Sequence, residues 1–288
     1  MWAAENWKDY ELIDTSDGER LEKWGKFTLV RPDPQVIWSA VKGRDWASAD
    51  ASYKRSKSGG GAWSSNRLPE SWSIGYEKLG LKFVIKPMGF KHTGLFPEQA
   101  ANWDWFYDLI AGTGRKIRVL NLFAYTGGAT VAAAAAGASV VHVDASKGMV
   151  AQAKENAALS GLSDAPIRYI VDDCRKFTER EIRRGNRYDA VIMDPPSYGR
   201  GPGGEMWKLE ENINELVKLT AGVLSDDPLF FLINSYTTGL SPLTMRYLID
   251  LNVKSRFGGV SDAGELALPV KRTGGYLPCG AAARWTKN

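Results

Sequence analysis

Cysteine and histidine are scarce in this chain of 288 residues, and their scarcity argues against two kinds of site. Cys174 and Cys279 are the only cysteines and lie far apart, outside any CxxC pair, so the sequence predicts neither a disulfide framework nor a cysteine metal cluster. His92 and His142 are the only histidines, too few for a histidine-rich metal site. We therefore expect no metal, and the two unpaired cysteines fit a reducing cytosol.

Long apolar runs and a signal-like start are also missing. No stretch reaches the about 18 consecutive apolar residues that a membrane span needs, and the N-terminus lacks the basic start and apolar run of a signal peptide. We therefore expect a cytoplasmic protein that does not engage membranes. The net charge of +4 permits an anionic partner such as RNA without requiring one.

The first part of the chain differs in character from the rest, and the change comes near residue 96. Nine of the eleven tryptophans precede residue 106, and we expect them mainly in a core. Short β-like runs broken by turns occupy residues 27–30, 36–38, 72–74 and 81–85, and residues 76–80 form the predicted turn of a hairpin. We predict that residues 1–95 form a small β-rich domain that takes part in substrate recognition.

Strands and helices alternate through residues 96–288. After a helix predicted over residues 98–111, strands are expected at 117–123, 139–143, 167–171, 188–193 and 229–233, and helices at 130–136, 146–159, 175–184 and 206–224. Alternation with short connections indicates an α/β fold with a mainly parallel sheet and helices on both faces.

The first motif is a buried strand that ends in a glycine turn and opens a helix. It reads Asn121-Leu122-Phe123-Ala124-Tyr125-Thr126-Gly127-Gly128. Ligands of open α/β sheets bind beyond the carboxyl ends of the strands, and glycine lets the backbone approach them closely. The GxGxxG spacing of dinucleotide sites is absent, which disfavours NAD. An ordinary strand–helix turn is the alternative for this motif alone.

Acidic residues end the next two predicted strands. Asp144 lies sixteen positions beyond Gly128, where a carboxylate can accept both hydroxyls of a ribose, and Ala145 and Ser146 follow it. Asp172 and Asp173 end the third strand, where an acid can bond an adenine amino group, with Asp173 slightly favoured. Helix capping is the alternative for each of these acids.

The fourth strand runs into a rigid ledge. It reads Asp194-Pro195-Pro196-Ser197-Tyr198, and proline fixes φ and removes a backbone donor. The Asp194 carboxylate and the proline carbonyls can accept a hydrogen bond from a flat amino group or base, and Tyr198 can stack on that base. A bare Pro-Pro turn is the alternative, but an acid and an aromatic residue flank this one.

Together the four motifs resemble those of class I S-adenosylmethionine-dependent methyltransferases, and more narrowly the large-subunit ribosomal RNA methyltransferases that modify cytosine C5 or guanine N7. The segment Lys91-His92-Thr93-Gly94-Leu95-Phe96-Pro97-Glu98-Gln99 also carries the resemblance, which covers roughly residues 70–288. It implies a Rossmann-like catalytic domain with a seven-stranded sheet. It also implies that the segment from His92 to Gln99 helps close the cofactor pocket.

The resemblance assigns the cofactor, S-adenosyl-L-methionine, to a defined set of residues. The predicted contacts are His92, Thr93, Phe96, Gln99, Asn121, Phe123, Ala124, Tyr125, Thr126, Gly127, Asp144, Ala145, Ser146, Asp172, Asp173, Cys174 and Asp194. The predicted catalytic residues are Asp194, Pro195, Pro196, Ser197 and Tyr198.

The chain departs from that family in two places. The first 70 residues do not look like an RNA-binding PUA module. After the fifth predicted strand the chain has Asn234-Ser235-Tyr236-Thr237 where the C5 enzymes carry a Ser-Cys pair. C5 chemistry needs a thiolate nucleophile at the target base, so the departure argues against it, whereas a nitrogen target needs no covalent step.

The substrate is predicted to be ribosomal RNA, with basic candidates for contact. These are Lys54, Arg55 and Lys57 in a loop at residues 53–61, the cluster Arg183, Arg184 and Arg187, and Arg200 in a glycine-rich loop expected to act as a lid. Solvated surface charge is the alternative for each. A methyltransferase acting on protein or a small molecule, and a non-catalytic RNA-binding protein, remain the competing functions.

Overall fold

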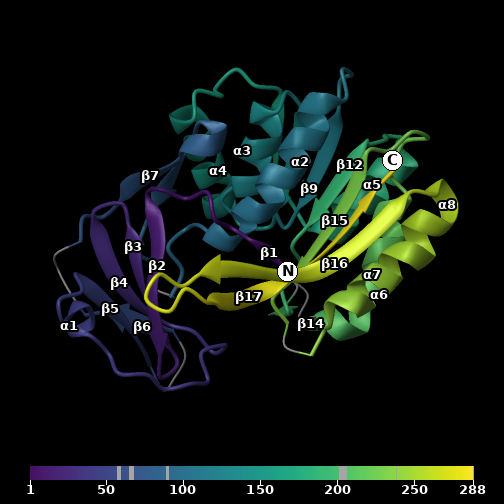
Figure 1. The fold of residues 1–288 in the computed structure, drawn as a ribbon. Coiled ribbons are helices and arrows are strands. Elements are labelled where there is room, and N and C mark those ends of the chain that lie inside the picture. Colours follow the sequence, from purple (N-terminus) through teal and green to yellow (C-terminus); the bar gives the residue numbers. More distant parts are fainter. Residues whose placement is uncertain (57–59, 65–67, 89–90, 201–205, 238, 288) are drawn as a thin grey trace. The chain divides into compact units, whose positions relative to one another are not determined.

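The computed structural model describes all residues except 57–59, 65–67, 89–90, 201–205, 238 and 288 (Figure 1). The chain divides into two compact units. The large unit holds Met1, Asn102–Leu266 and Gly280–Asn288, and the small unit holds Trp2–Ala101 and Ala267–Cys279. The sequence places one boundary at residues 95 and 96, whereas the small unit runs on to Ala101 and also takes in a late segment. Within the small unit Lys271 N donates to the Leu12 carbonyl, a pairing too distant in sequence to be foreseen.

A mixed sheet forms the centre of the large unit. Five strands in it are parallel: β9 (Arg118–Leu122), β10 (Ser139–Asp144), β11 (Ile167–Val171), β12 (Ala190–Met193) and β15 (Phe230–Ser235). The order is β1-β16-β17-β15-β12-β9-β10-β11, and β17 (Tyr276–Thr286) is antiparallel to β15. With β16 (Val260–Pro269) these make the predicted seven strands, and β1 (Trp2–Ala3) adds a two-residue eighth.

Helices cover both faces of this sheet (Figure 1). On one side lie α2 (Ala100–Gly112), α3 (Gly128–Ala135) and α4 (Lys147–Leu159). On the other lie α5 (Cys174–Arg183), α6 (Leu209–Ala221) and α7 (Pro242–Ile249), followed by a π-helical turn (Asp250–Lys254) and α8 (Ser255–Phe257). The α/β fold predicted from the alternating pattern and the Rossmann-like arrangement that the resemblance implies are both confirmed.

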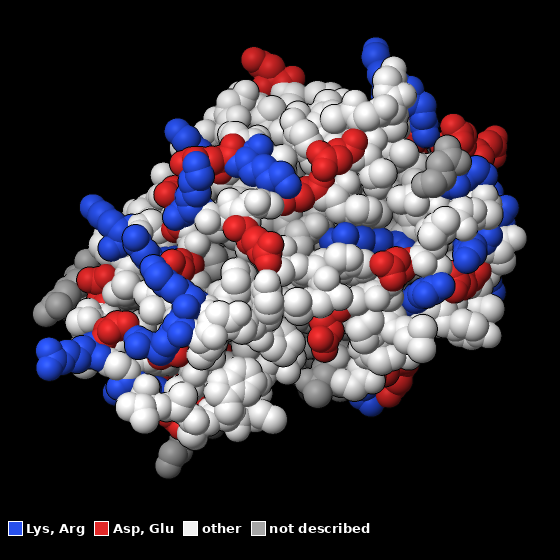
Figure 2. Space-filling model, viewed as in Figure 1, with Lys and Arg blue, Asp and Glu red and all other residues white. Residues whose placement is uncertain are grey.

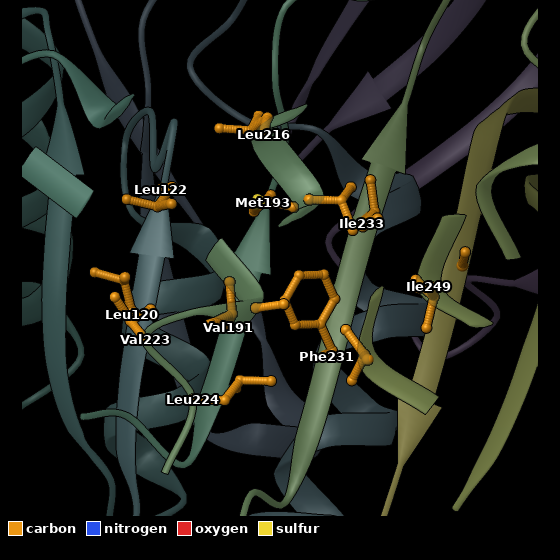
Figure 3. Packing of buried hydrophobic residues seen from close by; sticks show 14 of the residues in the cluster. Leu120, Leu122, Val191, Met193, Leu216, Val223, Leu224, Phe231, Ile233 and Ile249 are labelled. Atoms are coloured by element: carbon orange, nitrogen blue, oxygen red, sulfur yellow. The ribbon is translucent and has the colours of Figure 1, made fainter. Parts of the chain in front are cut away.

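The core on the α5–α7 side follows from the two-residue period of the strands. Val191 pairs with Leu120 and Phe231, and Met193 pairs with Leu122 and Ile233, so the apolar side chains stand in two rows across three strands. Figure 3 shows these rows with Leu216 of α6 and Ile249 of α7 packed near them. Burying one such side chain stabilises the fold by about 1.5–3 kcal/mol.

The small unit is rich in β-structure, as predicted. A five-stranded sheet is formed by β2 (Tyr10–Ser16), β3 (Glu19–Trp24), β4 (Phe27–Pro32), β5 (Ala51–Arg55) and β6 (Gly61–Trp63). A separate hairpin joins β7 (Trp72–Tyr76) to β8 (Leu81–Ile85) through the 3₁₀ turn Glu77–Leu79. The unit also holds the short helix α1 (Arg44–Ala47) and the 3₁₀ turn Pro97–Gln99.

Three local predictions are wrong. Residues 36–38 form no strand; the carbonyls of Val36 and Trp38 instead accept from the turn between β2 and β3. Residues 53–61 are not one loop, because Tyr53–Arg55 belong to β5 and Gly61 begins β6. The helix predicted from residue 206 begins only at Leu209, since β13 (Tyr198–Arg200) and β14 (Met206–Lys208) pair as a hairpin.

Surface charge is mixed in sign. Figure 2 shows basic and acidic side chains interspersed over the face in view, as a net charge of +4 on 288 residues leads us to expect. Among the described residues, no helix is both long and apolar enough to span a bilayer.

A buried charge cluster organises the small unit. The Glu22 side chain is fully buried, and it accepts from Arg31 Nε at 2.5 Å, Arg31 Nη2 at 2.8 Å and Tyr10 Oη at 2.8 Å. Burial alone would raise the pKa of Glu22, but Arg20 and Arg31 outweigh burial and lower it to about 2. Arg31 Nη1 also donates to the Lys91 carbonyl at 3.0 Å, which ties β4 to the segment that ends in Gln99.

Replacing Glu22 with Gln is expected to destabilise the protein by about 3–5 kcal/mol, because it leaves the buried Arg31 guanidinium without a carboxylate and leaves Arg20 with Asp33 alone, at 3.5 Å. Denaturant unfolding measures the loss. The matched control is Glu19→Gln on the same strand, whose carboxylate is partly exposed and pairs with Lys42 at 2.7 Å. It should cost less than about 1 kcal/mol. Equal losses in the two variants would contradict the role given to the cluster.

Candidate functional site

The carboxyl ends of four strands stand level in the large unit. Leu122 pairs with both Val143 and Met193, and Asp144 pairs with Val171. The residues at or just beyond these strand ends therefore lie along one edge: Phe123, Asp144, Asp172 and Asp194. The chain departs from β9 toward β10 and β11 and later returns to β12 on the other side of β9. Such a switch point is where open α/β sheets bind ligands.

The loop after β9 is strained. Phe123 and Tyr125 have positive φ values of 55° and 50°, and Gly127 has a φ of 82°. Left-handed backbone at a residue other than glycine costs of order 1–3 kcal/mol and persists only where neighbouring contacts impose it. Here Ala124 N donates to the Val143 carbonyl at 3.1 Å, and Phe123 N donates to Cys174 Sγ at 3.2 Å.

Asp144 anchors this loop to the next strand. Its Oδ2 accepts from Tyr125 N at 2.8 Å, and its Oδ1 accepts from Ser146 N at 2.8 Å. An ionised carboxylate offers about four acceptor positions, so two remain for a ligand hydroxyl pair. Ser146 also caps α4 by accepting from Met149 N. The anchoring role of Asp144 was not foreseen from the sequence, where only ribose binding and helix capping were weighed.

A row of hydrogen-bonded, buried polar side chains lies beneath the loop, between the sheet and α3. Asn121 Nδ2 donates to Thr130 Oγ1 at 2.8 Å, and Thr130 Oγ1 lies 2.9 Å from His142 Nδ1. Burial lowers the pKa of His142 to about 4, so the imidazole is neutral at pH 7. Asn121 is only 2% exposed. Its observed contacts therefore lie beneath the loop, and its predicted cofactor contact stays a prediction.

The acids after β11 are engaged in local structure. Asp173 Oδ1 accepts from Lys176 N at 2.8 Å and caps α5. Asp172 forms an ion pair with Arg180 and accepts from Asp173 N. The capping alternative is thus realised for Asp173, whose side chain stays exposed and retains acceptor positions for an amino group. The Cys174 thiol is buried, and burial raises its pKa.

The segment after β12 is fixed by contacts that its sequence did not reveal. Trp207 Nε1 donates to the Pro196 carbonyl at 2.6 Å, and Thr237 Oγ1 donates to Ser197 Oγ at 2.6 Å. Leu209 N donates to the Ser197 carbonyl at 3.0 Å. Trp207 is positioned there because it pairs with Gly199 in the β13–β14 hairpin. The ledge is therefore held by α6 and by the segment after β15 rather than by its prolines alone.

Aromatic side chains lie beside the ledge. The Trp207 and Phe123 ring centres are 6.3 Å apart, so the hairpin after β12 meets the strained loop after β9. The Tyr198 side chain is 54% exposed, and its hydroxyl lies 2.9 Å from Met206 Sδ. Trp207 is the residue that sequence reasoning missed; the hydrophobic pattern there was assigned to a helix.

The remaining predicted residues fall in three groups. His92, Thr93, Phe96 and Gln99 belong to the small unit, where burial lowers the pKa of His92 to about 4. Lys54 and Arg55 are exposed on β5 of the same unit. Arg200 ends β13, whereas Lys57 and the glycines at 201, 203 and 204 lie outside the described residues. The predicted roles of all three groups remain predictions.

The residues of the large unit fit S-adenosylmethionine. A strained loop, two acceptor-bearing acids and a ledge stand along one sheet edge, with polar groups for a ribose and an amino group. The cofactor would be held by the loop from Phe123 to Gly127, by Asp144 and by Asp173. Within the described residues, no three His, Cys, Asp or Glu side chains form a metal-binding group.

Replacing Gly127 with Ala is expected to weaken cofactor binding at least tenfold and to destabilise the fold by about 2–4 kcal/mol. The added Cβ would lie 2.8 Å from Ala153 Cβ, at a φ that L-residues rarely adopt. Calorimetric titration and denaturant unfolding check both effects. In the control Gly161→Ala, φ is also positive at 74° but nothing lies within 4 Å, so only about 1–2 kcal/mol of strain is expected. Unchanged cofactor affinity in Gly127→Ala would contradict the assignment of this loop to the cofactor.

Comparison with known proteins identifies the family of this chain. A family model described as S-adenosylmethionine-dependent methyltransferase matches residues 15–225. Ribosomal RNA large subunit methyltransferase K/L of Shewanella frigidimarina is 34% identical over 143 residues, which cover 49% of this chain and 19% of that protein. Its namesake in Shewanella oneidensis is 40% identical over 123 residues, or 42% and 16% of the two chains. The chain thus matches less than a fifth of the length of these relatives.

Solved structures match over the whole chain. The S-adenosylmethionine-dependent methyltransferase from Agrobacterium tumefaciens is 37% identical with a TM-score of 0.92, covering 100% of this chain and 93% of that one. A Streptococcus mutans structure with a TM-score of 0.76 is only 18% identical, covers 98% and 76% of the two chains, and supports the fold alone. The chain belongs to the family of S-adenosylmethionine-dependent methyltransferases.

Proposed function

We propose that the protein methylates a base of ribosomal RNA at a nitrogen atom. The observation that carries this proposal is the ledge from Asp194 to Tyr198. It presents acceptors and the exposed Tyr198 ring, and Trp207 joins it to the cofactor loop through Pro196 and Phe123. The ribosomal RNA methyltransferases among the relatives support the substrate class. Such a substrate would place the enzyme in the cytoplasm.

The state of the two thiols supports a nitrogen acceptor. Methylation at cytosine C5 requires a thiolate that attacks the base. Cys174 is 4% exposed and Cys279 is 9% exposed, and burial raises the pKa of both thiols. Both are therefore protonated at pH 7, and neither is the accessible thiolate that the C5 route needs. A ring or exocyclic nitrogen attacks directly with its own lone pair.

The ledge would orient that nitrogen. The cofactor supplies a methyl group on a sulfonium centre, and the protein supplies position and electrostatics. Because Trp207 already donates to the Pro196 carbonyl, we assign the hydrogen bonds of the base to the Asp194 carboxylate and the Pro195 carbonyl. Tyr198 stacks on the base. Holding both reactants in attack geometry supplies about 7–11 kcal/mol of the barrier.

Replacing Asp194 with Ala is expected to lower the methyl-transfer rate about 100-fold while the variant still binds cofactor, because it removes an acceptor aimed at the base. Cofactor affinity is measured by calorimetry and transfer by incorporation of labelled methyl groups. Asp164→Ala removes an exposed acid from the same unit and should leave both unchanged. Near wild-type transfer by the Asp194 variant would remove this residue from the proposed mechanism.

The substrate class is tested by mass spectrometry of ribosomal RNA nucleosides from cells with and without the protein. We expect one nitrogen-methylated nucleoside to disappear in its absence and to return with the wild-type gene, but not with the Asp194→Ala gene. Loss of a C5-methylated cytosine would contradict the nitrogen acceptor. An unchanged nucleoside profile would instead favour a protein or small-molecule substrate.

A further inference from the structure

Basic residues gather at the amino edge of the large unit's sheet, opposite the edge where the acids emerge. Arg118 begins β9 and Arg168 lies near the start of β11. Helix α5 runs antiparallel to the strands, so its end and the residues after it return to this edge. The arginines concerned, which we call the basal arginine surface, are Arg118, Arg168, Arg183, Arg184 and Arg187, all exposed.

A hollow of about 260 Å³ lies within this surface. Its lining includes Arg118, Arg168, Ser139, Tyr188 and one acid, Glu181. Arg118 is held over the Tyr188 ring, 5.2 Å from the ring centre. Arg118 pairs with Ser139 and Arg168 with Val141 in the sheet register, so both arginines leave the same face. Two strand spacings and an offset of two residues along the strand put their Cα atoms about 12 Å apart.

The acids near the hollow are already engaged. Glu181 is fully buried and accepts from Tyr188 Oη at 2.6 Å, Asn186 Nδ2 at 2.8 Å and Arg184 Nη1 at 3.2 Å. Asp189 accepts from Arg115 Nη1 at 3.0 Å and from Arg118 N at 2.8 Å. Within the described part of the chain, Arg118, Arg168, Arg183 and Arg187 form no ion pair, so their charge is not neutralised internally.

We propose that the basal arginine surface binds phosphate groups of the RNA substrate, away from the base being methylated. The inference rests on the proposed function and adds a second contact region to it. Arginine guanidinium groups are weakly hydrated and match phosphate geometry in two-point contacts. Cations that are spread along an edge rather than converging on one point suit a chain of phosphates better than a small anion. The pairing of arginine with a tyrosine ring holds one cation in place at little entropic cost.

The test measures the affinity for a fluorescently labelled RNA hairpin by anisotropy over a series of salt concentrations. The double variant Arg118→Gln/Arg168→Gln removes two phosphate contacts. It should reduce the slope of log affinity against log salt by about 1.4–1.8 and weaken binding roughly tenfold. Binding that keeps the wild-type slope overturns the proposal for the hollow.

Three further variants separate charge from packing. Arg118→Lys/Arg168→Lys keeps both charges and should retain most of the salt slope. Arg183→Gln/Arg187→Gln removes two exposed arginines, neither of which packs on a ring of the residues that the structure describes. This variant should reproduce the loss even if the Tyr188 contact proves necessary for folding. Lys26→Gln is the matched control in the small unit, an exposed cation over the Phe27 ring at 5.2 Å, and should leave binding unchanged.

The outcome for this surface is distinguishable from that for the proposed function. The wild-type protein could bind the hairpin through these arginines and yet leave ribosomal RNA unmethylated. That result would contradict the proposed function and support the proposed binding surface. The wild-type protein could instead methylate ribosomal RNA while both glutamine double variants keep the wild-type RNA affinity. That result would contradict only the proposed RNA binding at the basal arginine surface. Arginine-dependent binding to phosphatidylglycerol vesicles that exceeds RNA binding identifies a membrane surface and also overturns the proposal.

Discussion

Parallel pairing of β9 with both β10 and β12 is the constraint on which the rest of the site depends. It aligns the carboxyl ends of the strands. It also places the switch point, where the chain goes from one side of β9 to the other, beside the loop after β9. A slip of one residue would move Leu120 and Leu122 from the core cluster to the opposite face. The same slip would separate Asn121 from His142, its neighbour across the sheet.

Packing on the two faces of the sheet fixes that register, and the two faces differ in chemistry. Toward α5–α7 the contacts are apolar and fill the space between sheet and helices (Figure 3). Toward α3 the polar chain of Asn121, Thr130 and His142 has directional bonds that only one arrangement satisfies. The strained backbone at Phe123 and Tyr125 is therefore imposed by contacts on both sides. A preformed loop of this kind loses little entropy when it meets its cofactor.

Much of the large unit could be predicted from local signals, because its strands are short apolar runs between helices with clear starts. The strand at Ile167–Val171 matches its prediction residue for residue. The hairpin that carries Trp207 could not be foreseen, since Met206–Lys208 reads like the continuation of the helix that follows. In the small unit the hairpin of β7 and β8 and the strand β4 were predicted, and they are confirmed. The strands β2 and β3 and the buried Glu22 cluster were not, because they depend on packing between residues that the local pattern does not reveal.

The late hairpin of β16 and β17 has a consequence for how the protein is made. Its tip, Ala267–Cys279, belongs to the small unit, and there Lys271 N and Arg272 N donate to the carbonyls of Leu12 and Ile13. Arg272 also forms an ion pair with Asp14 at 2.7 Å. The ribosome delivers this tip only after β15 has been synthesised. The unit encoded first therefore waits for a segment that is made near the end of the chain, and the edge of β2 stays unpaired until that segment has been synthesised.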